Sequence, residues 1–377
     1  MKNVSLLIKP ASSLCNLCCR YCFYDDVSGN RSVKSMGLMT SETAEKLIRS
    51  ACEAVEPGGT ISFAFQGGEP TLAGLDFYRN FLEIESRYER PGIRVSRAIQ
   101  TNGVVLDEEW ASFLREHQFL VGLSADGTKD LNDLYRKDRE GKGTWNRITS
   151  VLHLLQKNRV EVNLLCVVTG QCARSPQKVY HTLKKLGVQY LQFIPCLDPL
   201  KGQRGEAPYS LSPDAYGKFL CGLFDAWYLD WKSGEYVSIR LFDDYVHLMM
   251  GLPSGSCATS GSCGSYFVVE SDGSLYPCDF YVLDEWRLGT LENASLPGAG
   301  ACALARKFQE EGLKKPDACA GCKWFPICLG GCKRDWQPVG GKLQNYYCPS
   351  FQRFFEYTAP RLAEVARTVA QTPPNGY

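Results

Sequence analysis

Histidine is scarce in this chain, whose 377 residues include only His117, His153, His181 and His247. No two of them have the spacing of paired metal ligands such as His-x-x-x-His, so any bound metal is expected to rest mainly on thiolates. Long apolar runs are also lacking, since none approaches the ~18 residues of a membrane-spanning helix. We therefore expect no membrane association.

An excess of either charge is lacking as well. Lys and Arg number 42 and Asp and Glu number 41, which leaves a formal net charge of +1. No large cationic field is available to hold nucleic acid, so that class of partner is not predicted. The start of the chain has only a short apolar stretch, typical of a strand rather than of a signal peptide. We expect a cytoplasmic protein.

The first two thirds of the chain alternate apolar, β-rich runs with helical patterns. The runs are residues 5–9, 60–66, 93–101, 119–124, 160–169 and 189–195. Between them, apolar side chains recur at helical spacing, as in Ala44, Leu47 and Ile48. Six β-α repeats predict parallel strands with right-handed crossovers, and hence an α/β protein with an incomplete barrel or a curved open sheet. Either arrangement places a site at the carboxyl ends of the strands.

The pattern changes after about residue 235. Residues 237–242 are predicted to form another strand, followed by glycine-rich turns and many cysteines. A final helix is expected over 351–371, interrupted or kinked near Pro360, with a frayed tail over 372–377. The predicted organisation is a partial barrel over 1–235, a cysteine-rich domain over 236–350, and a C-terminal helix and tail over 351–377.

Cysteine is abundant, with 18 residues in a chain large enough to fold without disulfides. Directly after the first predicted strand, Cys15, Cys19 and Cys22 have the spacing Cys-x3-Cys-x2-Cys. Three thiolates on one loop can bind three irons of a 4Fe–4S cluster and leave the fourth iron open to an outside ligand. A structural zinc loop or three unrelated thiols would also fit, and Cys15-x2-Cys18-x3-Cys22 is a second possible grouping.

This loop resembles the signature of the radical S-adenosylmethionine superfamily, whose spacing selects Cys19 and leaves Cys18 as a bystander. The resemblance implies a 4Fe–4S cluster that cleaves S-adenosylmethionine to a 5′-deoxyadenosyl radical. It also implies cofactor contacts on later strand ends, where the glycines of a Gly-Gly-Glu-Pro segment allow close backbone approach. The implied S-adenosylmethionine contacts are Tyr21, Gly67, Gly68, Glu69, Ser124, Arg136 and Leu197.

Each of these contacts has an implied partner on the cofactor. Glu69 would accept from the methionine amino group, and Ser124 with Arg136 would hold the carboxylate. Tyr21 and the backbone near Leu197 would contact adenine. Two alternatives stay open, because Gly-Gly before Pro is also a plain turn and Arg136 could be a solvated side chain.

Eight further cysteines lie in the last third of the chain. They are Cys257, Cys263, Cys278, Cys319, Cys322, Cys328, Cys332 and Cys348. Eight thiolates suffice for two fully ligated clusters, although four-thiolate zinc sites with Cys-x2-Cys are common. Spacing alone would group the four cysteines between 319 and 332.

The spacing of this cysteine group looks like a SPASM domain, the twin-cluster extension of peptide-modifying radical enzymes. That resemblance implies interleaved ligand sets. One cluster would be held by Cys257, Cys263, Cys278 and Cys332, and the other by Cys319, Cys322, Cys328 and Cys348. With the N-terminal loop, the implied total is three 4Fe–4S clusters. The remaining cysteines, Cys18, Cys52, Cys166, Cys172, Cys196, Cys221 and Cys302, are predicted to be mostly buried small hydrophobic residues.

Longer blocks, among them residues 7–13, 63–74, 119–124 and 276–284, resemble the anaerobic sulfatase-maturating enzymes. The resemblance implies that a Cys or Ser in a Cys/Ser-x-Pro/Ala-x-Arg segment of a sulfatase is oxidised to Cα-formylglycine. The radical would take a hydrogen atom from Cβ, and the auxiliary clusters would accept the next electron. The implied partners are the sulfatase polypeptide and an electron donor such as flavodoxin or ferredoxin.

Asp279 is the candidate catalytic base, because it follows Cys278 and would lie near an electron acceptor. A carboxylate close to anionic clusters is expected to have a raised pKa, which suits a base. The alternative is an aspartate that caps a turn. Gln66 and Gln100 are candidates for binding the substrate peptide.

Two other functions share part of these features. A related radical enzyme that joins a cysteine sulfur to a neighbouring carbon of a peptide would contain the same cluster motifs. A non-catalytic iron–sulfur carrier or a zinc scaffold is a different class of protein. The Gly-Gly-Glu-Pro segment with Ser124 and Arg136 disfavours both members of that second class.

Overall fold

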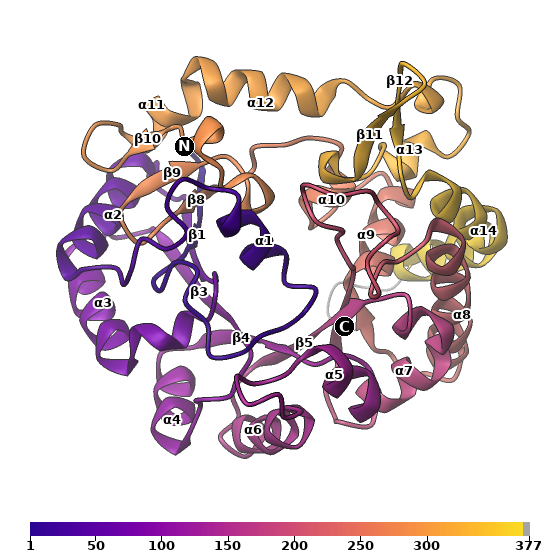
Figure 1. The fold of residues 1–377 in the computed structure, drawn as a ribbon, viewed down its shortest axis with the longest axis horizontal. Helices are drawn as coiled ribbons and strands as arrows, with labels where there is room; N and C mark the ends of the chain where they lie inside the picture. The colour runs from indigo at the N-terminus through magenta and orange to yellow at the C-terminus, as the bar shows by residue number, and fades with distance from the viewer. Residues whose placement is uncertain (372–377) are drawn as a thin grey trace.

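The computed structural model describes residues 1–371, so the predicted tail over 372–377 lies outside the described residues. Its centre is a run of six neighbouring parallel strands in chain order (Figure 1). The strands are β1 (Asn3–Ile8), β2 (Thr60–Phe65), β3 (Arg94–Thr101), β4 (Phe119–Ser124), β5 (Val162–Val168) and β6 (Tyr190–Pro195).

Side chains alternate between two environments along these strands. In β2, Ile61, Phe63 and Phe65 are buried, whereas the residues between them are half-buried. Phe65 packs edge-on against Tyr78 and Phe81 of the outer layer, with ring centroids 5.0 and 5.1 Å apart. Because successive strand residues point to opposite faces, the intervening side chains face the inside of the barrel.

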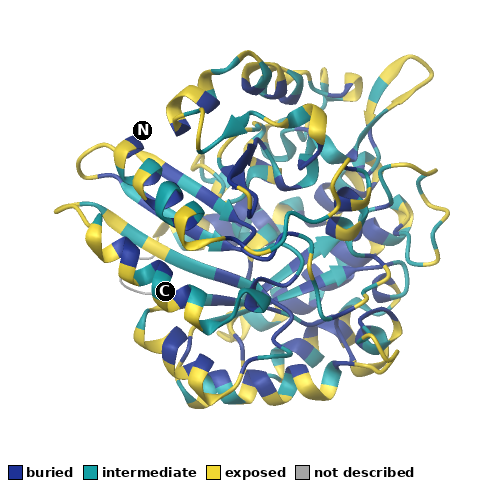
Figure 2. Ribbon diagram, turned by 60° about the vertical axis from the view of Figure 1, so that its left-hand side comes forward, coloured by how far each residue is buried: buried dark blue, intermediate teal, exposed yellow. Residues whose placement is uncertain are grey.

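Helices cover the outer face of the sheet (Figure 1). They are α2 (Ser41–Ala54), α3 (Leu75–Arg87), α4 (Glu108–Glu116), α6 (Trp145–Lys157), α7 (Pro176–Lys184) and α8 (Pro213–Lys232), with the shorter α1 (Phe23–Gly29) and α5 (Lys129–Tyr135) between strands and loops. Buried residues follow the strands and the inner helix faces, while exposed residues lie on the outer helix faces (Figure 2).

The barrel does not close, and the cysteine-rich segment extends its first edge. Strand β8 (Phe267–Val269) pairs with β1 in parallel, and β9 (Ser274–Tyr276) and β10 (Gly289–Thr290) follow antiparallel. The sheet therefore has ten strands in the order β10-β9-β8-β1-β2-β3-β4-β5-β6-β7. The extra pairings were not evident in the sequence, because the three strands are only two or three residues long.

Two local predictions for the C-terminal region were wrong. The strand expected over 237–242 is reduced to β7 (Ser238–Ile239), and helix α9 (Arg240–Met249) begins at the next residue. The final helix, α14 (Cys348–Gln371), begins earlier than expected and runs through Pro360 without interruption. Packing explains the second difference, since α14 buries Phe354, Phe355 and Leu362 against the core that includes α8 and α9.

The other elements of the C-terminal third are short and lie beside the open part of the barrel (Figure 1). They are α10 (Cys257–Ser260), α11 (Leu296–Ala301), α12 (Ala303–Leu313), α13 (Phe325–Cys328) and the hairpin of β11 (Trp336–Val339) and β12 (Lys342–Asn345). Across residues 1–371, no helix is both long and apolar enough to cross a membrane.

Candidate active site

A cavity at the carboxyl ends of the strands, here called the barrel cavity, gathers the predicted N-terminal site. It encloses about 1080 Å³ of space between protein atoms. Its lining includes Cys15, Cys19, Cys22, Tyr21, Gln66, Gly67, Gly68, Glu69, Gln100, Ser124, Arg136, Leu197 and Asp279. The structure thus brings together the N-terminal cysteines, the expected cofactor contacts, the peptide-binding candidates and the candidate base.

Strand geometry explains how the polar side chains reach this cavity. Gln66 follows β2, Gln100 lies in β3 and Ser124 ends β4, all on the inner face. Gln100 Nε2 donates to Ser124 Oγ at 3.0 Å. A Cβ on Gly122 would lie 2.1 Å from Gln100 Oε1, so glycine at this strand position leaves room for the glutamine.

The Gly-Gly-Glu-Pro segment packs against the cysteine loop. The amide of Gly68 donates to Ser12 O at 2.8 Å, and the amide of Glu69 donates to Leu14 O at 2.7 Å. A Cβ on Gly68 would lie 2.1 Å from Leu14 O. The close approach of this segment to the backbone of the cysteine loop therefore requires glycine at position 68. From the sequence, the glycines were predicted only to allow a ligand to approach the backbone.

The three cysteines of the loop share a dry environment. Burial raises the pKa of Cys15 to about 11, with further increases from Glu69 and Cys22. Burial likewise raises the pKa of Cys19 to about 12, although Arg136 opposes this increase. Three deprotonated thiols this close together would repel one another. A cationic iron centre would offset that repulsion and stabilise the deprotonated form. The cysteine loop therefore fits an iron–sulfur cluster.

The structure also separates the two possible cysteine groupings. Cys15, Cys19 and Cys22 line the barrel cavity, whereas Cys18 is exposed. The backbone amide of Cys18 donates to Lys137 O at 2.8 Å. This bond ties the loop to the segment after α5 and leaves the Cys18 side chain outside the cavity.

Arg136 is buried and has spare donor capacity in the barrel cavity. Its NH1 group donates to Tyr21 Oη at 3.2 Å, and Tyr21 donates in turn to Asp126. Within residues 1–371, no acceptor reaches Arg136 Nε, although that atom is inaccessible to solvent. An unpaired buried guanidinium nitrogen fits a carboxylate ligand. Asp126 was not singled out from the sequence, although its position directly after β4 was an available signal.

Glu69 has a different environment from the one expected. Its Oε1 accepts from the Thr71 amide and hydroxyl at 3.1 and 2.6 Å and from the Thr101 hydroxyl at 2.7 Å, and its Oε2 accepts from the Asn102 amide at 2.8 Å. Burial raises the pKa of Glu69, while these bonds lower it. Three donors converge on Oε1 and only one reaches Oε2, so Oε2 keeps a lone pair that can accept from an ammonium group.

Asp279 lies in a buried polar network at the cavity wall. Lys9 Nζ donates to Asp279 Oδ1 at 2.5 Å, and Gln66 Nε2 donates to Oδ2 at 3.2 Å. The Lys9 side chain is 0% exposed, and its Nζ lies 3.7 Å from the centre of the Tyr24 ring. Lys9 and Asp279 therefore form a buried ion pair at the cavity wall. The sequence interpretation missed Lys9, although it lies in the family-like block 7–13.

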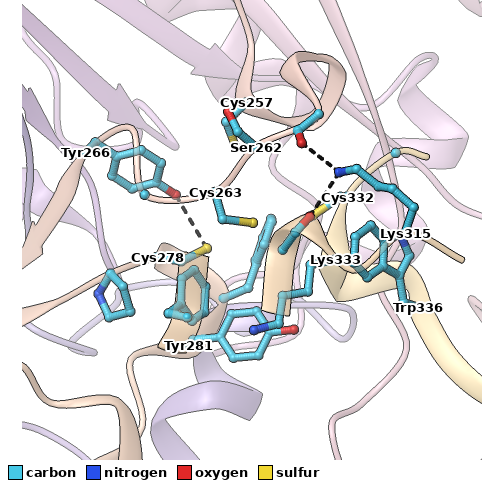
Figure 3. A pocket seen from close by; sticks show the side chains of 17 residues that line it. Cys257, Ser262, Cys263, Tyr266, Cys278, Tyr281, Lys315, Cys332, Lys333 and Trp336 are labelled. Carbon is cyan, nitrogen blue, oxygen red and sulfur yellow. Dashed lines mark hydrogen bonds between the residues drawn. The ribbon is translucent and has the colours of Figure 1, made fainter. Parts of the chain in front are cut away.

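The eight C-terminal cysteines line two further cavities. Cavity I has about 480 Å³ of space between atoms, and cavity II has about 400 Å³. Cavity I is lined by Cys257, Cys263, Cys278 and Cys332, and cavity II by Cys319, Cys322, Cys328 and Cys348. Figure 3 shows the cavity I cysteines arriving from separate segments. The structure thus produces the interleaved grouping implied by the SPASM resemblance.

Cavities I and II fit multi-atom clusters. Burial is the main cause that raises the pKa of Cys278 to about 12 and of Cys328 to about 12. Within residues 1–371, no three His, Cys, Asp or Glu side chains are arranged to hold a single metal ion. Each set of four sulfurs instead lines one cavity, and four thiolates are the number that fully ligates a 4Fe–4S cluster.

The scattered cysteines are less uniformly buried than predicted. Cys166, Cys172 and Cys196 are buried, while Cys52, Cys221 and Cys302 are half-buried. Cys302 Sγ accepts from the Ala305 amide at 3.4 Å at the start of α12. Together with the exposed Cys18, these residues show that the prediction of mostly buried thiols was only partly correct.

Known proteins share these sequence and structural features along nearly the whole chain. A Radical SAM superfamily model matches residues 10–183, and a model described as an iron-sulfur cluster-binding domain matches residues 261–323. The chain is 46% identical over 371 residues to a cysteine-type anaerobic sulfatase-maturating enzyme of Clostridium perfringens, covering 98% of this chain and 100% of that one. The chain belongs to the anaerobic sulfatase-maturating enzymes.

Other sulfatase-maturating enzymes extend the comparison. A serine-type anaerobic sulfatase-maturating enzyme of Klebsiella pneumoniae is 35% identical over 355 residues, covering 93% of this chain and 86% of that one. The solved structure of anSMEcpe with bound AdoMet and Cp18Cys peptide is 45% identical, with a TM-score of 0.92 over 97% of this chain and 99% of that one. These findings confirm the predicted family, the incomplete α/β barrel with a SPASM region, and the prediction of a radical enzyme containing iron–sulfur clusters.

Proposed function

We propose that this protein oxidises a cysteine in a sulfatase polypeptide to Cα-formylglycine and so activates the sulfatase. The observation that carries the proposal is full-length 46% identity to cysteine-type enzymes, compared with 35% to a serine-type enzyme. The segment Cys/Ser-x-Pro/Ala-x-Arg is the proposed recognition motif, with cysteine as the preferred residue. The reaction is proposed to occur in the cytoplasm.

The barrel cavity is the proposed reaction site. When bound, a 4Fe–4S cluster on Cys15, Cys19 and Cys22 together with S-adenosylmethionine supplies the radical that takes a hydrogen atom from the substrate Cβ. Arg136 offers its unpaired Nε to the methionine carboxylate, alongside the Ser124 hydroxyl. The other proposed cofactor contacts are Tyr21, Gly67, Gly68, Glu69 and Leu197.

Asp279 is the proposed base that receives the proton lost after hydrogen abstraction. Lys9 forms an ion pair with one carboxylate oxygen, and Gln66 donates to the second. Because the Gln66 amide already donates to Asp279, orienting the base is a more direct role for Gln66 than binding peptide. Gln100 remains the proposed peptide contact, since its Oε1 faces the strand position of Gly122 in the cavity.

Cavities I and II are the proposed auxiliary cluster sites. The proposed division of the chain is a partial barrel over 1–235, a domain that binds the two auxiliary clusters over 236–350, and a C-terminal segment over 351–377. The ligands in cavities I and II are the two cysteine sets described above. They suit the second half of the oxidation, in which the substrate loses one electron as Asp279 takes the proton. An electron carrier of the flavodoxin or ferredoxin class is the proposed external partner.

The experiment is anaerobic reconstitution followed by mass analysis of matched peptides. Enzyme, reductant and S-adenosylmethionine are combined with a Cys-x-Pro-x-Arg peptide or its Ser counterpart. We expect exchange of sulfur for oxygen in the Cys peptide and slower oxidation of the Ser peptide. Loss of two hydrogens with sulfur retained would instead indicate a thioether-forming enzyme and contradict the proposal.

A further inference from the structure

Cavity I contains two lysines with different electrostatic surroundings (Figure 3). Lys333 Nζ forms an ion pair with Glu311 Oε2 at 2.6 Å and lies 4.0 Å from the Phe308 ring centre. Lys315 Nζ instead donates to two backbone carbonyls, Gly261 O at 2.6 Å and Gly312 O at 2.9 Å. In the described part of the chain, no carboxylate pairs with Lys315, so its positive charge is not neutralised locally.

Lys315 also lies between the two auxiliary cavities. Its ammonium interacts electrostatically with Cys263 of cavity I and with Cys319 of cavity II. A Cβ on Gly330 would lie 3.2 Å from Lys315 Cδ and 3.5 Å from Cys319 Sγ, so the lysine stem and this sulfur flank the same glycine. One cation therefore faces thiolates that belong to different ligand sets.

We propose that the Lys315 ammonium raises the reduction potentials of both auxiliary clusters and so favours electron transfer from the substrate to them. This inference rests on the proposed assignment of the two cysteine sets. A cluster that gains an electron gains one negative charge, and a fixed cation nearby stabilises that reduced state. Lys333 also acts on Cys263, but its ion pair with Glu311 offsets part of its charge, whereas Lys315 has no such carboxylate partner in the described residues.

The electron balance assigns no redox change to Lys315 itself. The substrate carbon radical loses one electron and one proton. The proton would go to Asp279, and the auxiliary clusters held by the two cysteine sets would take up the electron and pass it to the external carrier. Lys315 changes only the relative free energies of the oxidised and reduced clusters.

Reduction titrations of the full-length holoenzyme followed by electron paramagnetic resonance test the inference. The variants are Lys315→Met and Lys315→Gln, which remove the charge, and Lys315→Arg, which keeps it. Lys314→Met is the matched control, because it removes the same charge from the exposed neighbouring residue. Signals that change on addition of S-adenosylmethionine belong to the barrel cluster, and the others report the auxiliary clusters.

We expect both neutral variants to lower the ratio of reduced to oxidised auxiliary cluster about tenfold at a fixed potential, which corresponds to about 59 mV for one electron. Lys315→Arg, Lys314→Met and the barrel cluster should stay within about twofold of the wild type. Unchanged auxiliary potentials in Lys315→Met and Lys315→Gln would overturn the inference. A shift in Lys315→Met alone would also overturn it, because Gln keeps a donor and the bonding rather than the charge would then matter.

Iron content separates this charge effect from folding defects. Loss of auxiliary iron in both neutral variants, with retention in Lys315→Arg, would support the same charge effect on an anionic cluster. Loss in Lys315→Arg as well would assign the residue to packing and overturn the inference. Absence of the auxiliary clusters from the wild type would refute the proposed function first, and that failure is visible before any variant is made.

Discussion

The barrel cavity and the two auxiliary cavities use cysteine in contrasting ways. The barrel cavity has three cysteines from one loop and a buried donor, Arg136 Nε, without a partner in the described residues. Cavities I and II each have four cysteines from more than one segment, spread over residues 257–332 in cavity I and over 319–328 plus Cys348 in cavity II. A set of three leaves a coordination position for a reacting ligand, whereas a set of four closes the site. The difference indicates chemistry in the barrel and electron storage beside it.

The largest effect on activity is expected from removing the three cysteines of the barrel cavity. Replacing Cys15, Cys19 and Cys22 together by Ala should abolish cleavage of S-adenosylmethionine and remove about four of ~12 irons per chain. Cys18→Ala is the matched control and should keep both, because that side chain lies outside the cavity. Iron and sulfide analysis with deoxyadenosine quantification provides the measurement. Full iron content in the triple variant would contradict the barrel assignment.

The next effect separates hydrogen abstraction from the later oxidation. Asp279→Asn keeps the size of the side chain but removes the proton acceptor, so formylglycine yield should fall by about 10²–10⁴-fold. Deoxyadenosine formation should fall less, because it precedes proton loss. With Cβ-deuterated peptide, deuterium should still reach deoxyadenosine. Normal yield with intact clusters would leave Asp279 a structural residue.

A smaller effect concerns the buried ion pair of Lys9 and Asp279 in the wall of the barrel cavity. Lys9→Met removes the cation from the buried pair with Asp279 and should lower the free energy of unfolding by about 3–5 kcal/mol. The double variant Lys9→Met with Asp279→Asn should recover part of this loss, since no buried charge stays unpaired. Lys142→Met, in an exposed pair with Glu140, should cost about 0–1 kcal/mol. Anaerobic urea unfolding measures these variants together with the Asp279→Asn single variant. A loss in the double variant equal to the sum of the two single losses would disprove the coupling.

The smallest effect tests the polar lining of the barrel cavity. Gly122→Ala places a methyl group where Gln100 Oε1 lies, and the flexible glutamine must turn away from Ser124. The loss of one neutral hydrogen bond corresponds to about 0.5–1.5 kcal/mol, so the KM for peptide should rise up to about tenfold with all clusters retained. Ala111 is buried in α4 and is not among the residues that line the cavity, so Ala111→Gly is the control for a one-methyl change. An unchanged KM would remove Gln100 from peptide binding.

Features set by short segments of the chain were predictable from the sequence. The β-rich run over residues 60–66 and the helical spacing of Ala44, Leu47 and Ile48 were correctly interpreted, because each depends on local backbone geometry. The Cys15, Cys19 and Cys22 set was also local, since one loop supplies all three thiols. The predicted interruption at Pro360 was wrong, because packing of α14 keeps the helix continuous.

The chain by itself determined the strand and helix alternation, the three-cysteine loop and, through family resemblance, the interleaved cysteine sets. Tertiary structure decided which distant groups meet: Lys9 with Asp279 across 270 positions, Lys315 between cavities I and II, and β8 beside β1. The physical reason is that sequence spacing controls geometry only within one turn, strand or loop. Contacts between remote segments depend on how the whole sheet and its covering helices exclude water from a shared core.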